Sequence, residues 1–285
     1  MDNYKGFISL NVNDSLIEDI HLDGRILIPQ DNNIYYPNMY VELISMSNLK
    51  HTALGKIDAT CKQIKKIDIK NIGNLKPKNR EQVFAMDALQ DKNISVVVLT
   101  GRSGSGKTLI SMNAALEQIN KKLYKKVILT RPMSEVGKYK LGSLPGFAEE
   151  KLGPYLSNYE TNLEHIVGDK CSLQDLMEQN RFSIVPLQLI RGASFNNCFI
   201  LIDELQILGP HEILTIGTRV GVGSKLIILG DLNQRDENIK KENTGMYKFV
   251  NSELAKMSPI VATIELQRCE RSATAMLFSK IFEEE

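Results

Sequence analysis

The pattern of hydrophobic and polar positions changes near residue 75. Before it, short runs rich in β-branched and aromatic residues are interrupted by Asn, Asp, Gly and Pro, as is typical of short strands joined by turns. These runs lie at residues 6–12, 25–30 and 40–46. After it, almost wholly apolar runs alternate with segments of helical period, which indicates βα units and a parallel sheet. The pattern therefore predicts a small β-rich domain over residues 1–74 and an α/β domain over residues 75–285.

Six apolar runs predict the strands of the parallel sheet. Each run is nearly free of polar residues inside, as expected of a strand that is covered on both faces. After the first run, Leu109, Met112, Leu116 and Ile119 are spaced three or four residues apart, which predicts a helix whose apolar stripe faces the sheet. The six runs are residues 95–100, 125–130, 181–186, 197–203, 224–230 and 261–266.

Length and composition are those of an ordinary globular protein. The 285 residues suffice for about two domains, and 35 basic against 34 acidic side chains indicate no particular partner. The first residues do not show the basic segment followed by an apolar segment that is typical of a signal peptide. No run approaches the roughly 18 apolar residues of a membrane span. We therefore expect a cytoplasmic protein that does not contact a membrane. The four cysteines lie far apart without a CxxC pair, which favours reduced thiols.

Glycine, lysine and threonine cluster directly after the first apolar run, in "VVVLTGRSGSGKTLI" at residues 96–110. Glycine permits positive φ and close approach, so main-chain N–H groups can converge on phosphate oxygens. Lysine adds a charge toward the β- and γ-phosphates, threonine offers a hydroxyl to Mg²⁺, and the next helix presents its N-terminus to the anion. The spacing Gly101-x4-Gly106-Lys107-Thr108, between a strand and a helix, predicts a nucleotide-binding P-loop. Its residues are Gly101, Ser103, Gly104, Ser105, Gly106, Lys107 and Thr108.

Polar residues that end two other apolar runs supply the remaining parts of a hydrolytic site. In "FILIDELQ", we expect Asp203 to hold Mg²⁺ through water together with Thr108, and Glu204 to polarise the attacking water. An acidic residue directly after Asp203 favours hydrolysis over group transfer. The run 224–230 delivers Asp231 and Gln234 to the same sheet edge, because ligands of open α/β sheets bind at the carboxyl ends of strands. Gln234 is therefore a candidate sensor of the γ-phosphate.

The expected nucleotide is ATP, bound with Mg²⁺. No Asn-Lys-x-Asp motif, which would read guanine, occurs in the chain. Upstream, "KPKNREQ" places Gln82 about twenty residues before the P-loop, where its side-chain amide could read an adenine edge. A lone Gln is more often an ordinary surface residue, so both interpretations of Gln82 stay open.

Taken together, these motifs resemble those of PhoH-like P-loop ATPases, which are related to superfamily 1 helicases. The resemblance covers about residues 75–285 and also rests on segments 129–156, 189–197, 218–234 and 266–272. The family usually has Asp-Glu-Ala-Gln at the second motif, where this chain has Leu205 in place of the alanine. The resemblance implies a RecA-like fold and a helicase-type ATPase that acts on RNA or single-stranded DNA. Longer similar proteins carry an N-terminal PIN ribonuclease domain, for which about 70 residues are too few, so we expect no nuclease activity.

The resemblance also implies an assembly. Related motors close their nucleotide site with an arginine from a second RecA-like domain, for which the residues after Arg271 leave no room. Such an arginine raises the rate by about 10³- to 10⁵-fold, so we expect a neighbouring subunit to supply it. The expected assembly is a homo-oligomer, which the family resemblance suggests is a hexameric ring. Arg219 and Arg271 are the candidate arginines.

Basic residues indicate where nucleic acid would bind. Arg131, Lys138 and Lys140 follow the strand next to the P-loop, where a nucleic-acid strand could be gripped. The basic run between Lys62 and Arg80 can attract phosphates, although a solvated linker is its commoner meaning. Two other function classes remain open. One is an ATP-driven protein remodeller or regulatory switch without nucleic acid, and the other is a small-molecule kinase.

Overall fold

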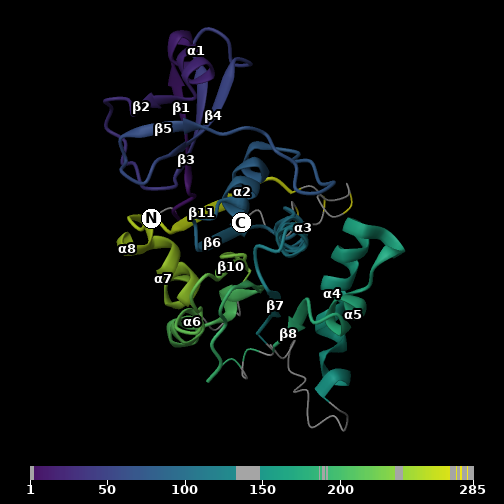
Figure 1. The fold of residues 1–285 in the computed structure, drawn as a ribbon. Helices are drawn as coiled ribbons and strands as arrows, with labels where there is room; N and C mark the ends of the chain where they lie inside the picture. The colour runs from purple at the N-terminus through teal and green to yellow at the C-terminus, as the bar shows by residue number, and fades with distance from the viewer. Residues whose placement is uncertain are drawn as a thin grey trace.

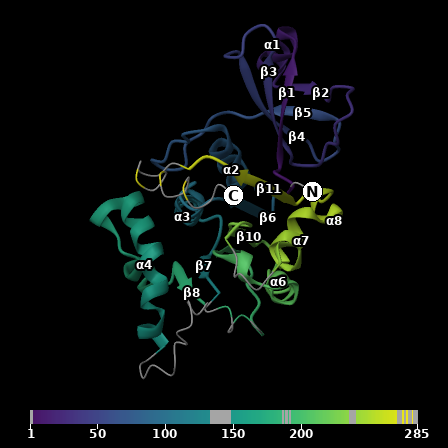
Figure 2. The same cartoon turned by 180° about the vertical axis from the view of Figure 1, so that it is seen from behind.

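Two β-sheets organise the chain, one formed between residues 7 and 66 and one from residue 96 onward (Figure 1). The computed structural model describes residues 3–132, 148–185, 187, 190, 192–234, 240–269, 274, 277 and 281. The later sheet forms the centre of the molecule, and the earlier one lies beyond one of its edges (Figures 1 and 2). This edge is formed by β11 (Val261–Leu266), the last strand of the central sheet in the sequence.

The N-terminal sheet has five strands in the order β1-β3-β4-β5-β2. β1 pairs with β3 in parallel, and the other pairs are antiparallel. Helix α1 (Asp14–Asp23) buries Ile17 and Ile20 in a separate core with residues of the strands. The strands are β1 (Phe7–Val12), β2 (Arg25–Leu27), β3 (Tyr40–Ser45), β4 (Thr52–Ile57) and β5 (Gln63–Lys66). The three predicted strands form, whereas α1, β4 and β5 were not predicted.

The central sheet has six strands, and every pair of neighbours is parallel. Their order is β11-β6-β10-β9-β7-β8. β10 therefore lies between β6, which precedes the P-loop, and β9, which precedes the acidic pair Asp203 and Glu204. All six predicted strands form, and the predicted RecA-like α/β P-loop fold is confirmed. The strands are β6 (Val96–Gly101), β7 (Lys126–Thr130), β8 (Phe182–Ile184), β9 (Cys198–Ile202), β10 (Lys225–Gly230) and β11 (Val261–Leu266).

Helices cover both faces of the central sheet, which explains why its strands are apolar throughout. Val97 and Leu99 of β6 pack in the core with one group of helices, and Val98 between them packs with the other group. The first group is α2 (Arg80–Gln90), α3 (Lys107–Asn120), α4 (Ala148–Val167) and α5 (Leu173–Glu178), and the second is α6 (Pro210–Gly217) and α7 (Gly245–Asn251). The short α8 (Glu253–Lys256) follows α7. Within the described ranges, none of the helices combines the length and the apolar character needed to cross a membrane.

The predicted apolar stripe of α3 is correct at three of its four positions. Met112, Leu116 and Ile119 are buried in the core beneath the sheet. Leu109 is only half-buried and lines a cavity at the P-loop instead. The prediction for Leu109 was wrong because its side chain lies on the cavity side of α3, whereas its neighbour Ile110 in the same turn is buried in the core.

Residues that flank strands of the N-terminal sheet are attached to the main chain in and beside β11. The side-chain amide of Asn38 donates hydrogen bonds to the carbonyls of Pro259 at 2.8 Å and Val261 at 3.0 Å. At Gly6, where φ is 77°, an added Cβ would lie 1.5 Å from the Thr263 carbonyl oxygen. Only glycine therefore fits this contact. The attachment covers one edge of the central sheet, and such edges otherwise invite pairing with other chains.

Candidate nucleotide-binding site

The P-loop follows β6 and ends where α3 begins at Lys107. Gly101, Gly104 and Gly106 have φ values of 133°, 82° and 93°, which glycine adopts at little cost. At Gly101 an added Cβ would lie 2.1 Å from the carbonyl oxygen of Leu266 in β11. The loop therefore needs glycine both for its backbone conformation and for the close approach of a neighbouring strand.

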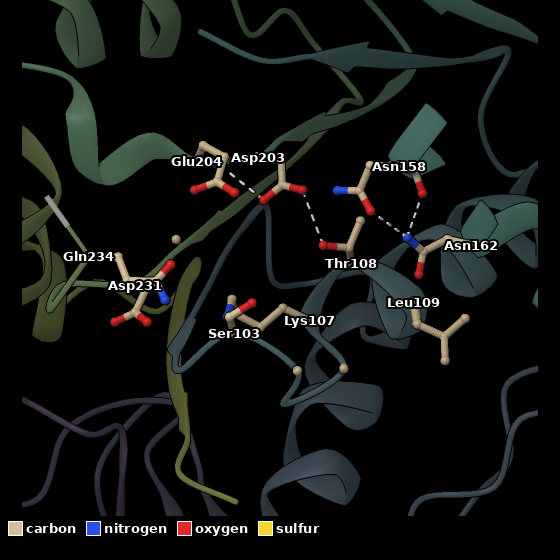
Figure 3. A pocket seen from close by; sticks show the side chains of 13 residues that line it. Ser103, Lys107, Thr108, Leu109, Asn158, Asn162, Asp203, Glu204, Asp231 and Gln234 are labelled. Carbon is tan, nitrogen blue, oxygen red and sulfur yellow. Dashed lines mark hydrogen bonds between the residues drawn. The ribbon is translucent and has the colours of Figure 1, made fainter. Parts of the chain in front are cut away.

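A cavity of about 190 Å³ lies at the P-loop, on the sheet edge formed by the carboxyl ends of the strands (Figure 3). The P-loop, α3, α4 and the ends of β9 and β10 all contribute to its lining. The structure thus brings together most of the predicted site residues from three distant parts of the sequence. Those that line the cavity are Ser103, Gly104, Gly106, Lys107, Thr108, Asp203, Glu204, Asp231 and Gln234.

Lys107 is buried and lies against its own loop. Its Nζ donates hydrogen bonds to the carbonyl oxygens of Gly101 at 2.6 Å and Arg102 at 3.0 Å. These acceptors are neutral, and hydrogen bonds between an ammonium and an anionic oxygen are about twice as strong as neutral ones. A phosphate in the cavity would therefore attract Lys107 away from these carbonyls.

Asp203 and Thr108 meet on the cavity wall. Asp203 directly follows β9 and is 4% exposed. Its Oδ2 accepts a hydrogen bond from the Thr108 hydroxyl at 3.1 Å, and its Oδ1 accepts one from the main-chain N–H of Glu204 at 2.9 Å. Burial raises the pKa of the Asp203 carboxyl above its ordinary value, and the charge of Glu204 raises it further. A cation beside Asp203 would oppose both effects.

This donor set fits Mg²⁺ bound together with a nucleotide. In the part of the chain that the structure describes, no group of three or more His, Cys, Asp and Glu side chains gathers to hold a metal. Mg²⁺ in nucleotide sites usually takes one or two carboxylates, substrate phosphates and several waters rather than an all-protein cage. One carboxylate at Asp203 and one hydroxyl at Thr108 are the protein ligands that this pattern requires.

Glu204 is held at both oxygens of its carboxylate. Its backbone is left-handed, with φ 60° and ψ 38°, which is uncommon outside glycine. Arg131 donates from a guanidinium nitrogen to Oε1 at 3.2 Å, and the Gln206 amide donates to Oε2 at 2.6 Å. The Gln206 side-chain oxygen accepts the main-chain N–H of Asp231 at 3.2 Å. One buried amide thus connects the ends of β9 and β10. No role was predicted for Gln206, although it lies in the same motif as the acidic pair.

Helix α4 contributes two cavity residues that sequence reasoning missed. Asn158 and Asn162 lie one helical turn apart, and Figure 3 shows them near Thr108. The Asn162 amide donates to the Asn158 side-chain oxygen at 3.0 Å. Between them, Tyr159 is buried and its hydroxyl donates to the Thr130 carbonyl at the end of β7, at 3.4 Å. Polar residues on a helix usually face solvent, so the sequence carried no signal for this pair.

Gln82 packs against the P-loop rather than lining the cavity. Its Oε1 accepts the main-chain N–H of Lys78 at 2.9 Å, and its Nε2 donates to the Ser105 carbonyl at 3.1 Å. Gln82 is 5% exposed, and the Ser105 side chain is also buried. Gly101 and Ser105 likewise shape the loop without lining the cavity. Contact between Gln82 and adenine stays a prediction.

The remaining predicted residues lie in three different situations. Arg131 pairs with Glu204, as described above. Arg219 lies between α6 and β10 and its carbonyl accepts from the main-chain N–H of Phe195, at the amino ends of β9 and β10. It is therefore at the sheet edge opposite the cavity. Outside the described residues lie Arg271, Lys138 and Lys140.

Comparison with known proteins agrees with this architecture. The family model described as PhoH-like protein matches residues 74–283. Protein PhoH2 of Bacillus subtilis (strain 168) is 33% identical over 282 residues, a match that covers 96% of this chain and 63% of that protein. Protein PhoH2 of Mycolicibacterium smegmatis is 30% identical over 283 residues, covering 99% and 63%. The chain thus spans less than two thirds of the length of these relatives.

Solved structures also include similar chains. The large terminase from a thermophilic bacteriophage is similar with a TM-score of 0.47 and 12% identity, over 73% of this chain and 51% of that chain. The family model matches most of this chain, including the P-loop, Asp203 and Glu204, and the loop after β10. The chain belongs to the PhoH-like protein family.

Proposed function

We propose that the chain binds ATP with Mg²⁺ in the P-loop cavity and hydrolyses it, and that single-stranded RNA or DNA stimulates the hydrolysis. One observation carries the hydrolytic part. Lys107, Thr108, Asp203 and Glu204, from two segments far apart in the sequence, line one cavity at the carboxyl edge of a parallel sheet. Ligands of open α/β sheets bind at this edge.

Each side chain has a distinct task in this proposal. Lys107 binds the β- and γ-phosphates, while Thr108 and Asp203 would hold the Mg²⁺ that accompanies the nucleotide. Mg²⁺, when bound, would neutralise charge that develops on the phosphates. Glu204 accepts a hydrogen bond from the attacking water and orients it toward the γ-phosphate. Gln234, on the loop after β10, senses the presence of that phosphate.

Two observations support nucleic acid as the stimulating partner. The first is membership in the PhoH-like protein family, together with the resemblance of the motifs to those of ATPases related to superfamily 1 helicases. The second is that cations of the basic run, including Lys62, Lys65, Lys70 and Lys78, are exposed to solvent. Exposed cations attract phosphate backbones, and the attraction falls steeply with salt.

The test is a steady-state ATPase assay with and without single-stranded RNA and DNA, at low and moderate salt. We expect stimulation that weakens as salt increases. An unchanged rate with both nucleic acids would favour the protein remodeller or switch. Transfer of labelled γ-phosphate to an acceptor other than water would favour the kinase.

A homo-oligomer belongs to the same proposal. Six residues of β10 span about 20 Å, so Arg219 at the amino edge lies too far from the cavity of its own chain to contact a phosphate there. If Arg219 serves as the arginine of the site, it serves a neighbouring subunit. Measuring the mass in solution tests the assembly, and a monomeric ATPase of full activity would contradict it.

A further inference from the structure

The two side chains that hold Glu204 differ in how firmly they are fixed. Gln206 is 3% exposed, and the Asp231 main chain fixes its amide from the other side. The Arg131 side chain is 27% exposed and that of Glu204 is 35% exposed. Ion pairs between partly exposed side chains are weak and are screened by salt. The Gln206 contact is therefore a permanent part of the site, whereas the Arg131 contact can be exchanged.

Arg131 approaches Glu204 from outside the nucleotide space. Glu204 lines the cavity, but Arg131 does not. A nucleotide that fills the cavity would therefore leave Arg131 where it is, and the exposed part of its side chain stays accessible from solvent. A guanidinium binds phosphate through two parallel hydrogen bonds, which is stronger and more specific than its single contact with Glu204.

We propose that Arg131 is a positioning residue that restrains Glu204 until a phosphate of the bound nucleic acid takes its guanidinium. In the restrained state, Arg131 occupies Oε1 and fixes the direction of the carboxylate. When Arg131 turns to the phosphate, Oε1 becomes available to the attacking water, while Gln206 still orients Oε2. The exchange explains how one arginine serves both the predicted nucleic-acid contact and the hydrolytic site. This inference rests on the proposed function and deepens it.

The test compares the ATPase rates of wild type and Arg131→Met, each with and without oligouridylate and oligothymidylate. An exposed ion pair of ordinary strength predicts that the rate without nucleic acid rises about two- to fivefold in Arg131→Met. The stimulation factor is expected to fall toward one, because the restraint that nucleic acid relieves is already absent. Arg131→Lys keeps the charge but loses the two-pronged geometry, and its stimulation factor is expected to lie between the two.

The matched control is Lys121→Met, which removes a cation from an exposed pair with Glu117 on α3 and should leave both rates unchanged. A parallel fall of basal and stimulated rates in Arg131→Met, or an unchanged stimulation factor, would overturn the inference. Arg131→Gln repeats the comparison if the methionine variant does not fold. If nucleic acid fails to stimulate wild type, the proposed function is wrong, and the basal rates of the variants still test whether Arg131 restrains Glu204.

Discussion

The Thr108 hydroxyl donates a hydrogen bond to Oδ2 of Asp203 at 3.1 Å, which joins the first turn of α3 to the end of β9. The two residues are 95 positions apart in the sequence. Their contact places a hydroxyl and a carboxylate side by side on the cavity wall. It also identifies the point at which the protein would meet a divalent cation.

Asp203→Asn is expected to abolish the effect of Mg²⁺ on ATP binding without unfolding the protein. The asparagine oxygen can still accept the Thr108 hydrogen bond, but the charge that attracts the cation is lost. Because burial already disfavours the charged form of Asp203, its removal should not lower the free energy of unfolding. Calorimetric titration with ATP, with and without Mg²⁺, measures the effect. Equal enhancement by Mg²⁺ in wild type and variant would exclude Asp203 from the metal site.

Lys107→Ala and Glu204→Gln should separate binding from hydrolysis. Removing the Lys107 ammonium removes the charge that would meet the phosphates, so we expect loss of nucleotide binding. Glu204→Gln keeps the size of the side chain but cannot polarise water as a carboxylate does. It is expected to bind ATP and to turn over about 10²- to 10⁴-fold more slowly. Equal loss of binding in both variants, measured with a fluorescent ATP analogue, would contradict these roles.

Gln206→Leu should lower the turnover number more than the affinity for ATP. The substitution frees Oε2 of Glu204 and leaves the buried Asp231 N–H without its acceptor, which costs about 1–3 kcal/mol of stability. Gln118→Leu is the matched control, because Gln118 is also buried and its amide bonds the Leu89 carbonyl far from the cavity. We expect both variants to lose stability and only Gln206→Leu to lose turnover. Equal turnover in the two variants would assign Gln206 a purely structural role.

Lys225 should make the stability of the fold depend on pH. Its Nζ donates to the carbonyls of Ala88 and Asp91 at the end of α2, each at 2.7 Å, and burial lowers its pKa to about 7. An unfolded lysine titrates near about 10.4. Between these pH values the unfolded chain binds more protons than the folded one. The contribution of Lys225 to the free energy of unfolding is therefore fully present above about pH 10.4 and is lost as the pH falls to about 7.

The check is urea unfolding of wild type and Lys225→Met between about pH 6.5 and about 9.5, chosen around the window set by these two pKa values. The stability of wild type relative to the variant is expected to increase with pH. The neutral amine still has two hydrogens, one for each carbonyl, so the hydrogen bonds persist in this form. A difference that does not change with pH would show that Lys225 stays charged.

Mixed assemblies should reveal a shared active site. Subunits with Arg219→Ala or Arg271→Ala lack the candidate arginine, and subunits with Lys107→Ala lack nucleotide binding. If an arginine acts across an interface, a Lys107→Ala subunit can supply it to a neighbour that binds ATP. Mixing the inactive variants is then expected to restore part of the ATPase activity. Mixtures that stay as inactive as the separate variants would argue against an arginine from a neighbour.

The central sheet was predictable from sequence because each of its strands is covered on both faces. Such strands are continuous apolar runs, and all six were identified. The N-terminal sheet was harder. The strand Thr52–Ile57 contains Gly55 and Lys56, and the helix Asp14–Asp23 buries only Ile17 and Ile20. With one face open to solvent and few apolar residues, these elements carry a weak signal.

The site divides in the same way. The P-loop, Asp203 and Glu204 are local motifs at strand ends, and parallel topology alone brings such ends together. The contact of Arg131 with Glu204 and the position of Asn158 depend on how separate elements pack in three dimensions. An arginine or an asparagine is as common on a solvated surface as on a cavity wall, so the residue types at positions 131 and 158 carry no signal. Residue patterns therefore predicted the chemistry of the site but not the contacts that hold it.

β11 connects the two sheets mechanically. At one end, the Leu266 carbonyl abuts Gly101 of the P-loop, and at the other end, Pro259 and Val261 accept hydrogen bonds from Asn38, which lies just before β3 of the N-terminal sheet. The strand between them is extended and pairs with β6 along its whole length, so it has little slack to absorb a displacement. A displacement of the loop would therefore be passed along the strand, whose six residues span about 20 Å. Deleting the N-terminal residues would consequently remove contacts along the length of a strand whose last residue abuts the glycine-rich loop.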